Sequence, residues 1–439
     1  MGIWRSPWSS SHQSPSPDEK EQPPTENDVN HTSDDLKKVA AENDLSASAQ
    51  QAQGTAWLAG RLNHLTPEQE EKLVEFKKRL QELGYYTPES KNDGTETREA
   101  SHSDSLLLRF LRARKFDVNG AIKQFTDTED WRKENAIDAL YDNIDLESYE
   151  ETRLMYPQWT GRRDYRGIPV YLFEIKHLTS KRVAEFQAKV SSSGTAYTHK
   201  ESKIPARLLC LFSLYENLLN FVHPVCSMLD RPHPETPIME SNNIVDISGV
   251  SLMQFWNLRS HMQDASVLST AHYPETLDRI FIIGAPSFFP TVWGWIKRWF
   301  DPVTVSKIFI LSQSEVKPTL EKFMPPSSIP EKYGGTLKFQ FGDMPNLDDA
   351  ARELIGGVEC GPPKDGETKP TYLKGPMRCY HDRIEVLGTV NGTPRRMTIP
   401  LGQKASAAPS NGHVGDTVSN EKVDGVNGAP VVNETTAAS

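Results

Sequence analysis

Residues 280–300 read IFIIGAPSFFPTVWGWIKRWF and carry the strongest structural signal in the chain. The first four residues form a short, continuous apolar run, which is typical of a buried strand. The Trp-rich segment, residues 287–300, then places three of the nine tryptophans of the chain within residues 293–299. Wound as a helix, this segment carries two adjacent apolar stripes: Phe288, Val292, Trp295 and Trp299, and beside them Phe289, Trp293, Ile296 and Phe300.

Two interpretations of the Trp-rich segment remain open from its residues alone. Only Lys297 and Arg298 interrupt its apolar surface. Such a helix is either a core helix or one that covers an apolar cavity and meets a membrane interface. Tryptophan rings and basic side chains suit that interface, because each has an apolar body and a polar end.

Strand and helix patterns alternate in the sequence before this segment. Residues 167–173 predict a turn and a strand, and Ile244–Ile247 predicts a short buried strand. Residues 204–222 and about 251–269 have the apolar spacing of helices. The alternation predicts an α/β fold class with a sheet layer.

A small helical lobe is expected before the α/β layer. Thr66 and Gln69 have the spacing of a capping box, and a helix is expected over 67–83. Asp104 is expected to cap the next helix, and a third is expected over about 118–134.

Composition divides the 439 residues into ordered and disordered parts. Both ends are poor in aliphatic residues and cannot bury enough surface to offset the entropy of ordering. An Asn391-Gly392 turn predicts a β-hairpin within 383–400. The expected organisation is a disordered tail over 1–60, a helical lobe over 61–150, an α/β lobe over 151–338, an extension over 339–402 and a disordered tail over 403–439.

Charge and cysteine usage exclude several protein classes. The net charge of −10 disfavours a generally basic nucleic-acid binder. Four widely spaced cysteines predict neither a disulfide framework nor a zinc site of defined spacing. No transmembrane helix and no signal peptide are expected. The start fits a loose myristoylation pattern at Gly2, although Pro7 is unfavourable for that modification.

Catalytic and metal-binding motifs are also absent from the sequence. The phosphate-binding loop, dinucleotide-binding, zinc-protease and serine-hydrolase patterns do not occur. The twelve histidines are scattered without ligand spacing. We therefore expect no enzyme, no catalytic residue, no metal site and no cofactor.

Several blocks together resemble the phosphatidylinositol-transfer branch of the CRAL-TRIO lipid-binding family. They occur in the order of the family and cover about 65–338. The blocks are Leu107 to Val118, Trp131-Arg132-Lys133, Tyr156-Pro157-Gln158, Gly167 to Tyr171, Tyr273-Pro274-Glu275, Asp301 to Leu311 and Lys332-Tyr333-Gly334-Gly335. The resemblance implies a helical N-terminal lobe beside an α/β lobe, whose sheet floors an apolar lipid pocket gated by the Trp-rich segment.

The resemblance also implies a site for an inositol-phosphate headgroup. The matching residues are Arg114, Lys115, Glu275, Thr304 and Lys307. Arginine and lysine suit a phosphodiester, because an uncompensated buried anion costs several kcal/mol. Taken singly, each residue has a plainer interpretation, such as a cation at a helix end or a solvated charge.

A second headgroup site of the family, for a choline lipid, is matched only in part. Tyr171 and Ser241 match, whereas Thr160 replaces an expected tyrosine and Asn243 replaces an expected threonine. The second ligand is therefore expected to differ from a choline lipid, and the extension lies outside the family core.

The function implied is that of a phosphatidylinositol-binding lipid-transfer protein, with bound phospholipid as ligand and no cofactor. It would exchange lipid at a membrane surface or present it to a lipid kinase. We expect a monomer in the cytoplasm, peripheral on internal membranes, with no nucleic-acid partner. The alternative is a non-transferring, lipid-sensing adaptor that recruits a partner through its extension.

Overall fold

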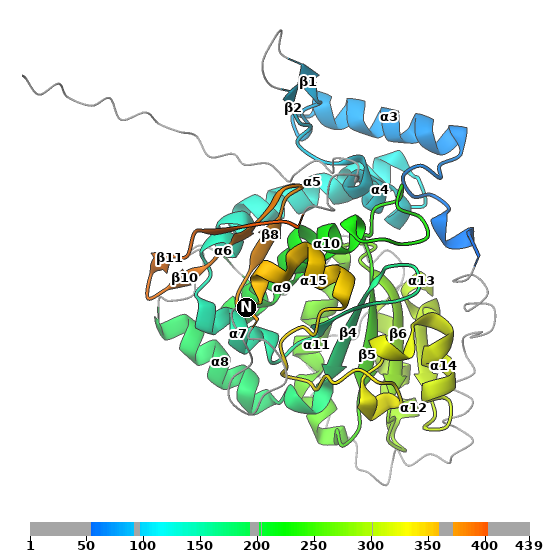
Figure 1. Cartoon of the computed structure of the whole chain (residues 1–439), viewed down its shortest axis with the longest axis vertical. Coiled ribbons are helices and arrows are strands. Elements are labelled where there is room, and N and C mark those ends of the chain that lie inside the picture. Colours follow the sequence, from blue (N-terminus) through cyan, green and yellow to red (C-terminus); the bar gives the residue numbers. More distant parts are fainter. Residues whose placement is uncertain are drawn as a thin grey trace, which may run out of the picture.

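The capping box at Thr66 is confirmed in the computed structural model, which describes residues 54–91, 97–193, 202, 204–300, 302–359 and 372–402 (Figure 1). The Thr66 hydroxyl accepts from the Gln69 backbone N–H at 3.3 Å, and the Gln69 side chain accepts from the Thr66 N–H at 3.1 Å. Helix α3 (Pro67–Glu82) begins there and buries Leu73, Phe76 and Leu80, at the spacing that the sequence predicts.

Two further helices complete the core of the helical lobe. They are α4 (Asp104–Ala113) and α5 (Val118–Glu134). The cap of α4 is Ser103 rather than the expected Asp104, because the Ser103 hydroxyl accepts from the Leu106 N–H at 3.2 Å. Asp104 instead lies in the first turn, where a negative charge is favourable. Helices α6 (Ile137–Asn143) and α7 (Leu146–Arg153) lead on to the sheet.

The α/β layer predicted from the sequence is confirmed. Within the described residues the largest sheet has five strands in the order β3-β4-β5-β6-β7. Strand β3 pairs with β4 antiparallel, and β4 to β7 are parallel. The strands are β3 (Gln158–Arg163), β4 (Pro169–Glu174), β5 (Ser241–Asp246), β6 (Leu277–Ile283) and β7 (Ile308–Leu311).

The two faces of this sheet have different neighbours. On one face, Leu172, Ile244, Phe281 and Phe309 pack with α14 (Val316–Phe323) and with Ile329. We call the opposite face, which meets α11 and α12, the inner face. Helix α11 (Leu252–His272) confirms the helix predicted over about 251–269; it begins one residue later and ends three residues later.

The predicted helix over 204–222 begins near the expected residue and runs further. Helix α9 (Ala206–Asn217) continues through one π-helical stretch, η4 (Leu218–Val222), into α10 (His223–Met228). Pro224 lacks a backbone N–H, and the π turn directly before it is a usual way to keep such a helix continuous. By length and hydropathy Ala206–Met228 could cross a membrane, but 67% of its apolar window is buried inside the protein.

The Trp-rich segment is helical, as predicted, but not as one uniform helix. It forms α12 (Phe289–Ile296) and a 3₁₀ turn, η5 (Lys297–Trp299). The short helix α13 (Pro302–Ser306) then leads into β7.

The extension belongs to the same core as the α/β lobe. Leu347, Ile355, Val358, Ile384 and Val386 pack in one cluster with Trp159, Phe221 and Val222. Its elements are α15 (Asp349–Ile355), β8 (Met377–Cys379), β9 (Arg383–Val386), β10 (Thr389–Val390), β11 (Thr393–Pro394) and β12 (Met397–Pro400). The hairpin predicted at Asn391-Gly392 is confirmed by the β10–β11 pairing, with φ values of 51° and 76° at the two turn residues.

The boundary at residue 60 is corrected by the structure. Residues Ala56–Leu58 form a 3₁₀ turn, η2, in which Trp57 and Leu58 are 8% and 2% exposed. Two large apolar residues within a polar stretch are sufficient to attach this segment to the folded chain. Residues 1–53 of the tail expected over 1–60, and the whole tail expected over 403–439, lie outside the described residues.

The remaining short elements connect these layers. They are α8 (Ser180–Ser193), β1 (Ser90–Lys91), β2 (Thr97–Arg98), η3 (Ile175–His177), η6 (Pro326–Ser328), η7 (Glu331–Tyr333) and η8 (Gly356–Val358).

Candidate functional site

The inner face of the sheet carries two rows of side chains. Strand register places Tyr171, Asn243, Ile280 and Ile308 in one row across β4 to β7. It places Phe173, Val245, Ile282 and Ile310 in the next row, two residues further along each strand. Because side chains alternate along a strand, both rows point to the same face.

The two rows are not uniformly buried. Ile282, Ile308 and Ile310 are 9%, 3% and 5% exposed, because α12 packs over β6 and β7. By contrast Tyr171, Phe173, Asn243, Val245 and Ile280 are only half-buried. Protein interiors are normally close-packed. The side chains on β4 and β5 therefore keep some solvent-accessible surface on the inner face.

Three of the predicted headgroup residues meet where two parallel strands begin. Glu275 lies two residues before β6 with a φ of 55°, and Lys307 lies directly before β7. Thr304 lies in α13, and its backbone carbonyl accepts from the Lys307 N–H at 3.1 Å. A parallel connection must return to the same edge of the sheet. The α12–α13 crossover therefore starts beyond the end of β6 and delivers Thr304 and Lys307 to the edge where Glu275 stands.

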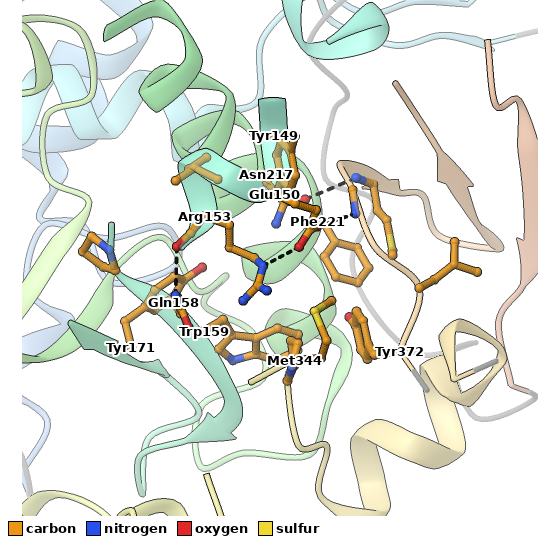
Figure 2. Close-up of a pocket in the computed structure, with 16 residues that line it drawn as sticks. Tyr149, Glu150, Arg153, Gln158, Trp159, Tyr171, Asn217, Phe221, Met344 and Tyr372 are labelled. Atoms are coloured by element: carbon orange, nitrogen blue, oxygen red, sulfur yellow. Dashed lines mark hydrogen bonds and ion pairs between the residues drawn. The ribbon is translucent and has the colours of Figure 1, made fainter. Parts of the chain in front are cut away.

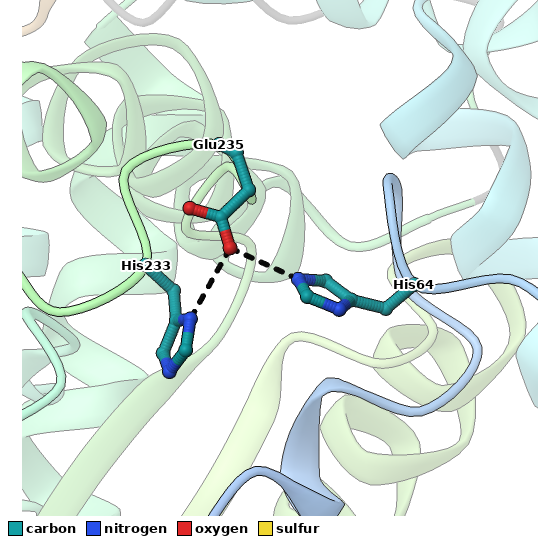
Figure 3. A group of neighbouring side chains, drawn as sticks. All are labelled: His64, His233 and Glu235. Carbon is teal, nitrogen blue, oxygen red and sulfur yellow. Dashed lines mark hydrogen bonds and ion pairs between the residues drawn. The ribbon is translucent and has the colours of Figure 1, made fainter.

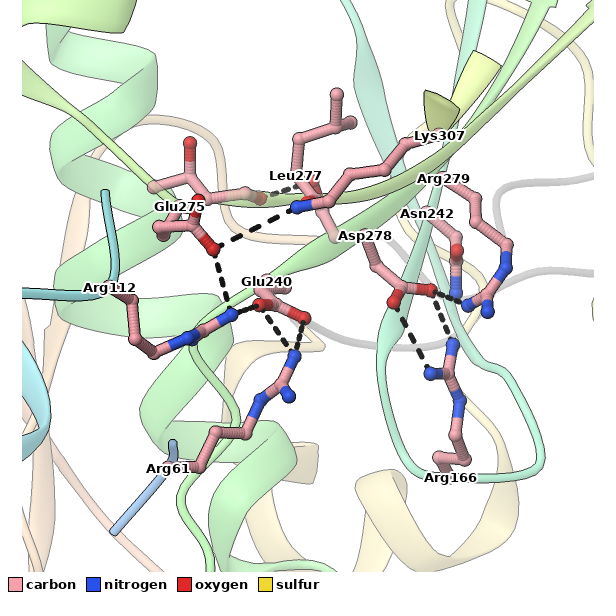
Figure 4. A network of polar contacts seen from close by, with 12 residues as sticks. Arg61, Arg112, Arg166, Glu240, Asn242, Glu275, Leu277, Asp278, Arg279 and Lys307 are labelled. Atoms are coloured by element: carbon pink, nitrogen blue, oxygen red, sulfur yellow. Dashed lines mark hydrogen bonds and ion pairs between the residues drawn. The ribbon is translucent and has the colours of Figure 1, made fainter. Parts of the chain in front are cut away.

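A network of ion pairs joins this edge to the helical lobe (Figure 4). Arg112 of α4 donates to Glu275 at 2.7 Å and to Glu240 at 2.8 Å. Arg61 donates to both oxygens of Glu240, at 2.7 and 2.6 Å. Lys307 donates to the Leu277 carbonyl at 2.8 Å and lies 3.8 Å from Glu275. We call these five charged residues, Arg61, Arg112, Glu240, Glu275 and Lys307, the edge network.

The edge network holds more positive than negative charge. Burial by itself would raise the pKa of the Glu240 carboxyl, but Arg61 and Arg112 outweigh burial and hold that pKa well below its usual range. Glu240 is thus an anion, and three cations face two carboxylates. The surplus charge and the half-buried Lys307 suit an added anion such as a phosphodiester.

Arg114 and Lys115 lie in the turn after α4. Lys115 is exposed and has a φ of 51°, and the side chain of Arg114 runs along α5 beside Gly120. The residue of this block that contacts Glu275 is Arg112, which sequence reasoning missed.

Glu240 and Arg61 were missed as well, for reasons of position. Arg112 stands in the same sequence block as Arg114, and it is the last cation before α4 ends at Ala113, so the helix fixes its direction. Residue spacing did not single out Glu240 or Arg61, since Glu240 lies in a loop and Arg61 lies at the start of the helical lobe, before its first predicted helix.

The residues expected at a second headgroup site are also placed. Tyr171 and Asn243 are register partners on the inner face, and Asn243 donates to the Ser241 hydroxyl at 3.2 Å. Thr160 is fully buried and donates to the Val170 carbonyl at 2.9 Å, so its hydroxyl forms a hydrogen bond between strands β3 and β4.

Tyr171 also lines a pocket at the edge of the sheet, under the extension (Figure 2). Tyr149, Trp159 and Phe221 supply apolar walls, and Tyr372 approaches from the extension. The pocket has about 60 Å³ of space accessible to water-sized groups.

The Trp-rich segment is buried in its first half and more open in its second half, so the burial does not follow the two predicted stripes. Phe288, Phe289, Val292 and Trp293 are 8%, 1%, 1% and 2% exposed. Trp295, Ile296, Phe300 and Lys297 are half-buried, and Arg298 is exposed. The Trp299 side chain lies outside the described side chains. Trp295 packs edge-to-face against Trp256 of α11, with 5.9 Å between ring centroids.

Comparison with protein-family models identifies two adjoining matches. Residues 72–127 match the N-terminal CRAL/TRIO domain, and residues 155–335 match the CRAL/TRIO domain. Both matches agree with the lobes described above.

Curated relatives cover most of the same region. A CRAL-TRIO domain-containing protein of Saccharomyces cerevisiae is 34% identical over 300 residues, which are 65% of this chain and 86% of the relative. The SEC14 cytosolic factor of Kluyveromyces lactis is 31% identical over 297 residues, covering 68% of this chain and 88% of the relative. A phosphatidylinositol/phosphatidylcholine transfer protein of Arabidopsis thaliana is 29% identical over 273 residues, covering 62% of this chain and 42% of the relative.

Solved structures are also similar, among them that of Sfh5. The crystal structure of Sfh5 aligns over 55% of this chain and 74% of its own, with a TM-score of 0.40 and 18% sequence identity.

Proposed function

Because the chain belongs to the CRAL-TRIO family, in its phosphatidylinositol-transfer branch, we propose that it binds phosphatidylinositol and transfers it between membranes. No bond is made or broken in this function, so the protein acts as a carrier and not as an enzyme. The ligand is a membrane phospholipid, and no cofactor takes part.

The observation that carries the proposal is the incompletely buried centre of the sheet. Phe173 and Val245 are apolar, lie on central strands and still have accessible surface. An acyl chain laid against them would gain about 0.8 kcal/mol for each methylene removed from water. The same sheet ends at the edge network, so a lipid along the inner face would bring its headgroup towards Lys307.

The headgroup is held at the edge network. Lys307 and Arg112 offer charged donors to the phosphate, while Thr304 and Glu275 bond inositol hydroxyls. Arg114 and Lys115 add positive charge next to Arg112. A neutral lipid has no phosphate to balance these cations, which favours an anionic headgroup.

The Trp-rich segment acts as the gate. Its buried first half covers β6 and β7, and its second half presents Trp295, Ile296 and Phe300 beside the basic Lys297 and Arg298. When the segment swings onto a bilayer, the rings enter the interface and the cations meet anionic headgroups. The inner face is then open for lipid exchange.

The setting proposed for this function is the cytoplasm, with transient attachment to internal membranes. The protein works as a monomer and presents phosphatidylinositol to a lipid kinase, whose substrate headgroup it holds at the protein edge. The second ligand is a lipid other than a choline lipid, because Thr160 gives its hydroxyl to the sheet.

The adaptor alternative assigns partner recruitment to the extension. Val390 and Met397 are 42% and 48% exposed on the extension and would offer a contact surface. The two functions differ in one measurable property, which is whether lipid leaves the protein on contact with acceptor vesicles.

The test compares lipid content and transfer in the parent chain and in Lys307→Ala. Mass spectrometry of co-purified lipid should find phosphatidylinositol in the parent and its loss in the variant. Transfer of labelled phosphatidylinositol between vesicles should fall at least about tenfold, since a charged hydrogen bond contributes about 1.5–3 kcal/mol. Transfer of the second lipid should persist.

Lys322→Ala is the matched control, because Lys322 is an exposed lysine on α14, on the other side of the sheet. It should leave both lipids and both rates unchanged. A co-purified lipid that the Lys307 change does not alter would refute the inositol assignment. Bound lipid without any transfer to vesicles would favour the adaptor.

A further inference from the structure

Two histidines and a glutamate from distant parts of the chain converge at the surface (Figure 3). The Nε2 atom of His64 lies 3.0 Å from Oε1 of Glu235, and Nδ1 of His233 lies 3.2 Å from the same oxygen. The three potential ligand atoms all lie within 4.8 Å of one another. The edge network contains none of these residues.

The three side chains are set in place by contacts that do not involve their ligand atoms. The Asn63 amide donates to the Glu235 carbonyl at 2.5 Å, and the Thr236 hydroxyl donates to the Leu62 carbonyl at 3.2 Å. Trp57 meets the His233 ring edge-to-face, with 5.9 Å between centroids. The segment 56–64, which we call the N-terminal strap, is thereby fastened to the loop 230–240.

The spacing of the ligand atoms fits a small tetrahedral cation. Metal–ligand bonds of about 2.0–2.2 Å to nitrogen and oxygen place ligand atoms about 3.3–3.5 Å apart in a tetrahedron. The two distances to Glu235 are within a few tenths of an ångström of that spacing. Both imidazoles face one carboxylate oxygen, and the three residues are 30%, 28% and 42% exposed, which leaves a side open to solvent.

We propose that His64, His233 and Glu235 form a site for a divalent transition metal, with Zn²⁺ as the ion that this donor set suits best. Two imidazoles and a carboxylate are ordinary zinc ligands, and water completes the tetrahedron. Residues 64 and 233 are too far apart in sequence for any spacing motif to reveal the site. The sequence expectation of no metal rested on such motifs.

Metal binding would fix the N-terminal strap. Arg61 belongs to the same strap and holds Glu240, the carboxylate that also binds Arg112. A bound ion therefore secures one end of the edge network, whichever lipid the protein carries. The test of the metal site does not depend on whether the protein transfers lipid.

The test is titration of Zn²⁺ into the full chain, purified metal-free and without a histidine tag. Isothermal titration calorimetry should give one equivalent per chain, accompanied by a change in tryptophan fluorescence from Trp57. Glu235→Gln should weaken binding at least about tenfold, because even outer-shell partners of a metal contribute 10–100-fold. Glutamine retains an acceptor oxygen. Hydrogen bonds from the two imidazoles to residue 235 would therefore survive this change, whereas metal binding would not.

His381→Ala is the matched control, since the His381 side chain is 84% exposed and lies outside the cluster. It should bind Zn²⁺ as the parent does. Absence of a stoichiometric site in the parent, or equal affinity in the parent and Glu235→Gln, would overturn the proposal. Co²⁺ added to the parent gives a readout that needs no variant: a strong visible band of tetrahedral Co²⁺ supports the site, and its absence refutes it.

Discussion

At the scale of single residues, the protein holds an uncharged histidine where the lobes meet. His223 opens α10 and is 1% exposed. Burial, and after it the nearby Arg109, lower the pKa of His223 to about 3. The imidazole therefore stays neutral in the folded protein while the same group in the unfolded chain takes up a proton below about pH 6.5.

This difference predicts a stability that depends on pH. A lowered folded pKa gives stability that is fully present above about pH 6.5 and is lost as the pH falls towards 3. The loss is about 1.4 kcal/mol per pH unit for one proton. In His223→Leu, urea unfolding between pH 6 and 4.5 should show a pH slope smaller by about one proton. His381→Ala should keep the parent slope, and an unchanged slope in His223→Leu would contradict the linkage.

The edge network contains some residues that the sequence predicted and others that it did not. Glu275 and Lys307 were found because each stands in a recognisable block next to a strand. Arg112 was passed over for Arg114, although Arg112 lies inside α4 and contacts Glu275. The choice depends on where the helix ends, and helix ends are the least certain feature of a sequence prediction.

At the scale of elements, the sequence correctly predicted the features that depend only on neighbouring residues. The Thr66 capping box and the Asn391-Gly392 turn are set by neighbouring residues, and both are confirmed. The helix predicted over 204–222 continues six residues further, to Met228. A π turn carries it past Pro224, and this depends on packing against the extension, which no local pattern reports.

The gate proposed for α12 and η5 predicts a specific electrostatic effect. Charge reversal of Lys297 and Arg298 should weaken binding to vesicles rich in anionic lipid by at least about tenfold, since each cation near such a surface contributes about 1 kcal/mol. The buried first half of the segment is untouched, so the fold should be retained, and the thermal midpoint checks this. Binding should be measured by vesicle sedimentation at two salt concentrations, and the difference between parent and variant should shrink at high salt.

Reversal of Lys78 and Lys133 is the control for this gate prediction. Both lysines are exposed and belong to the helical lobe, on α3 and α5. The net charge changes by the same amount, so a general charge effect would weaken both double variants equally. If the Trp-rich segment itself contacts the membrane, vesicle binding should fall only in the variant with reversed Lys297 and Arg298.

At the scale of the whole molecule, the extension is part of the lipid-binding lobe and not an appendage. Leu347, Ile355, Val358, Ile384 and Val386 are each 0% exposed and share a cluster with Trp159 and Phe221. Tyr141 of α6 also donates to the Met377 carbonyl. A family resemblance that ends near residue 338 could not anticipate this, because the contacts cross from one sequence region to another.

The shared core predicts opposite outcomes for two truncations. Removing 403–439 leaves every described residue in place, so the thermal midpoint and the co-purified lipid should match those of the full chain. Ending the chain at 338 removes the five fully buried side chains named above and exposes their partners. At about 1.5–3 kcal/mol for each, the loss is on the order of 10 kcal/mol, comparable with the whole stability of a typical domain.

The shorter chain should therefore be insoluble, or unfold without a cooperative transition in calorimetry. Loss of lipid exchange on deleting 339–439 would consequently say nothing about partner recruitment, and the adaptor alternative has to be tested by surface changes. Replacing the exposed Val390 and Met397 by charged residues keeps the core intact and removes the apolar contact surface. A soluble 1–338 chain with a sharp unfolding transition would show instead that the extension is a separate unit, and recruitment through it would again be open to test by deletion.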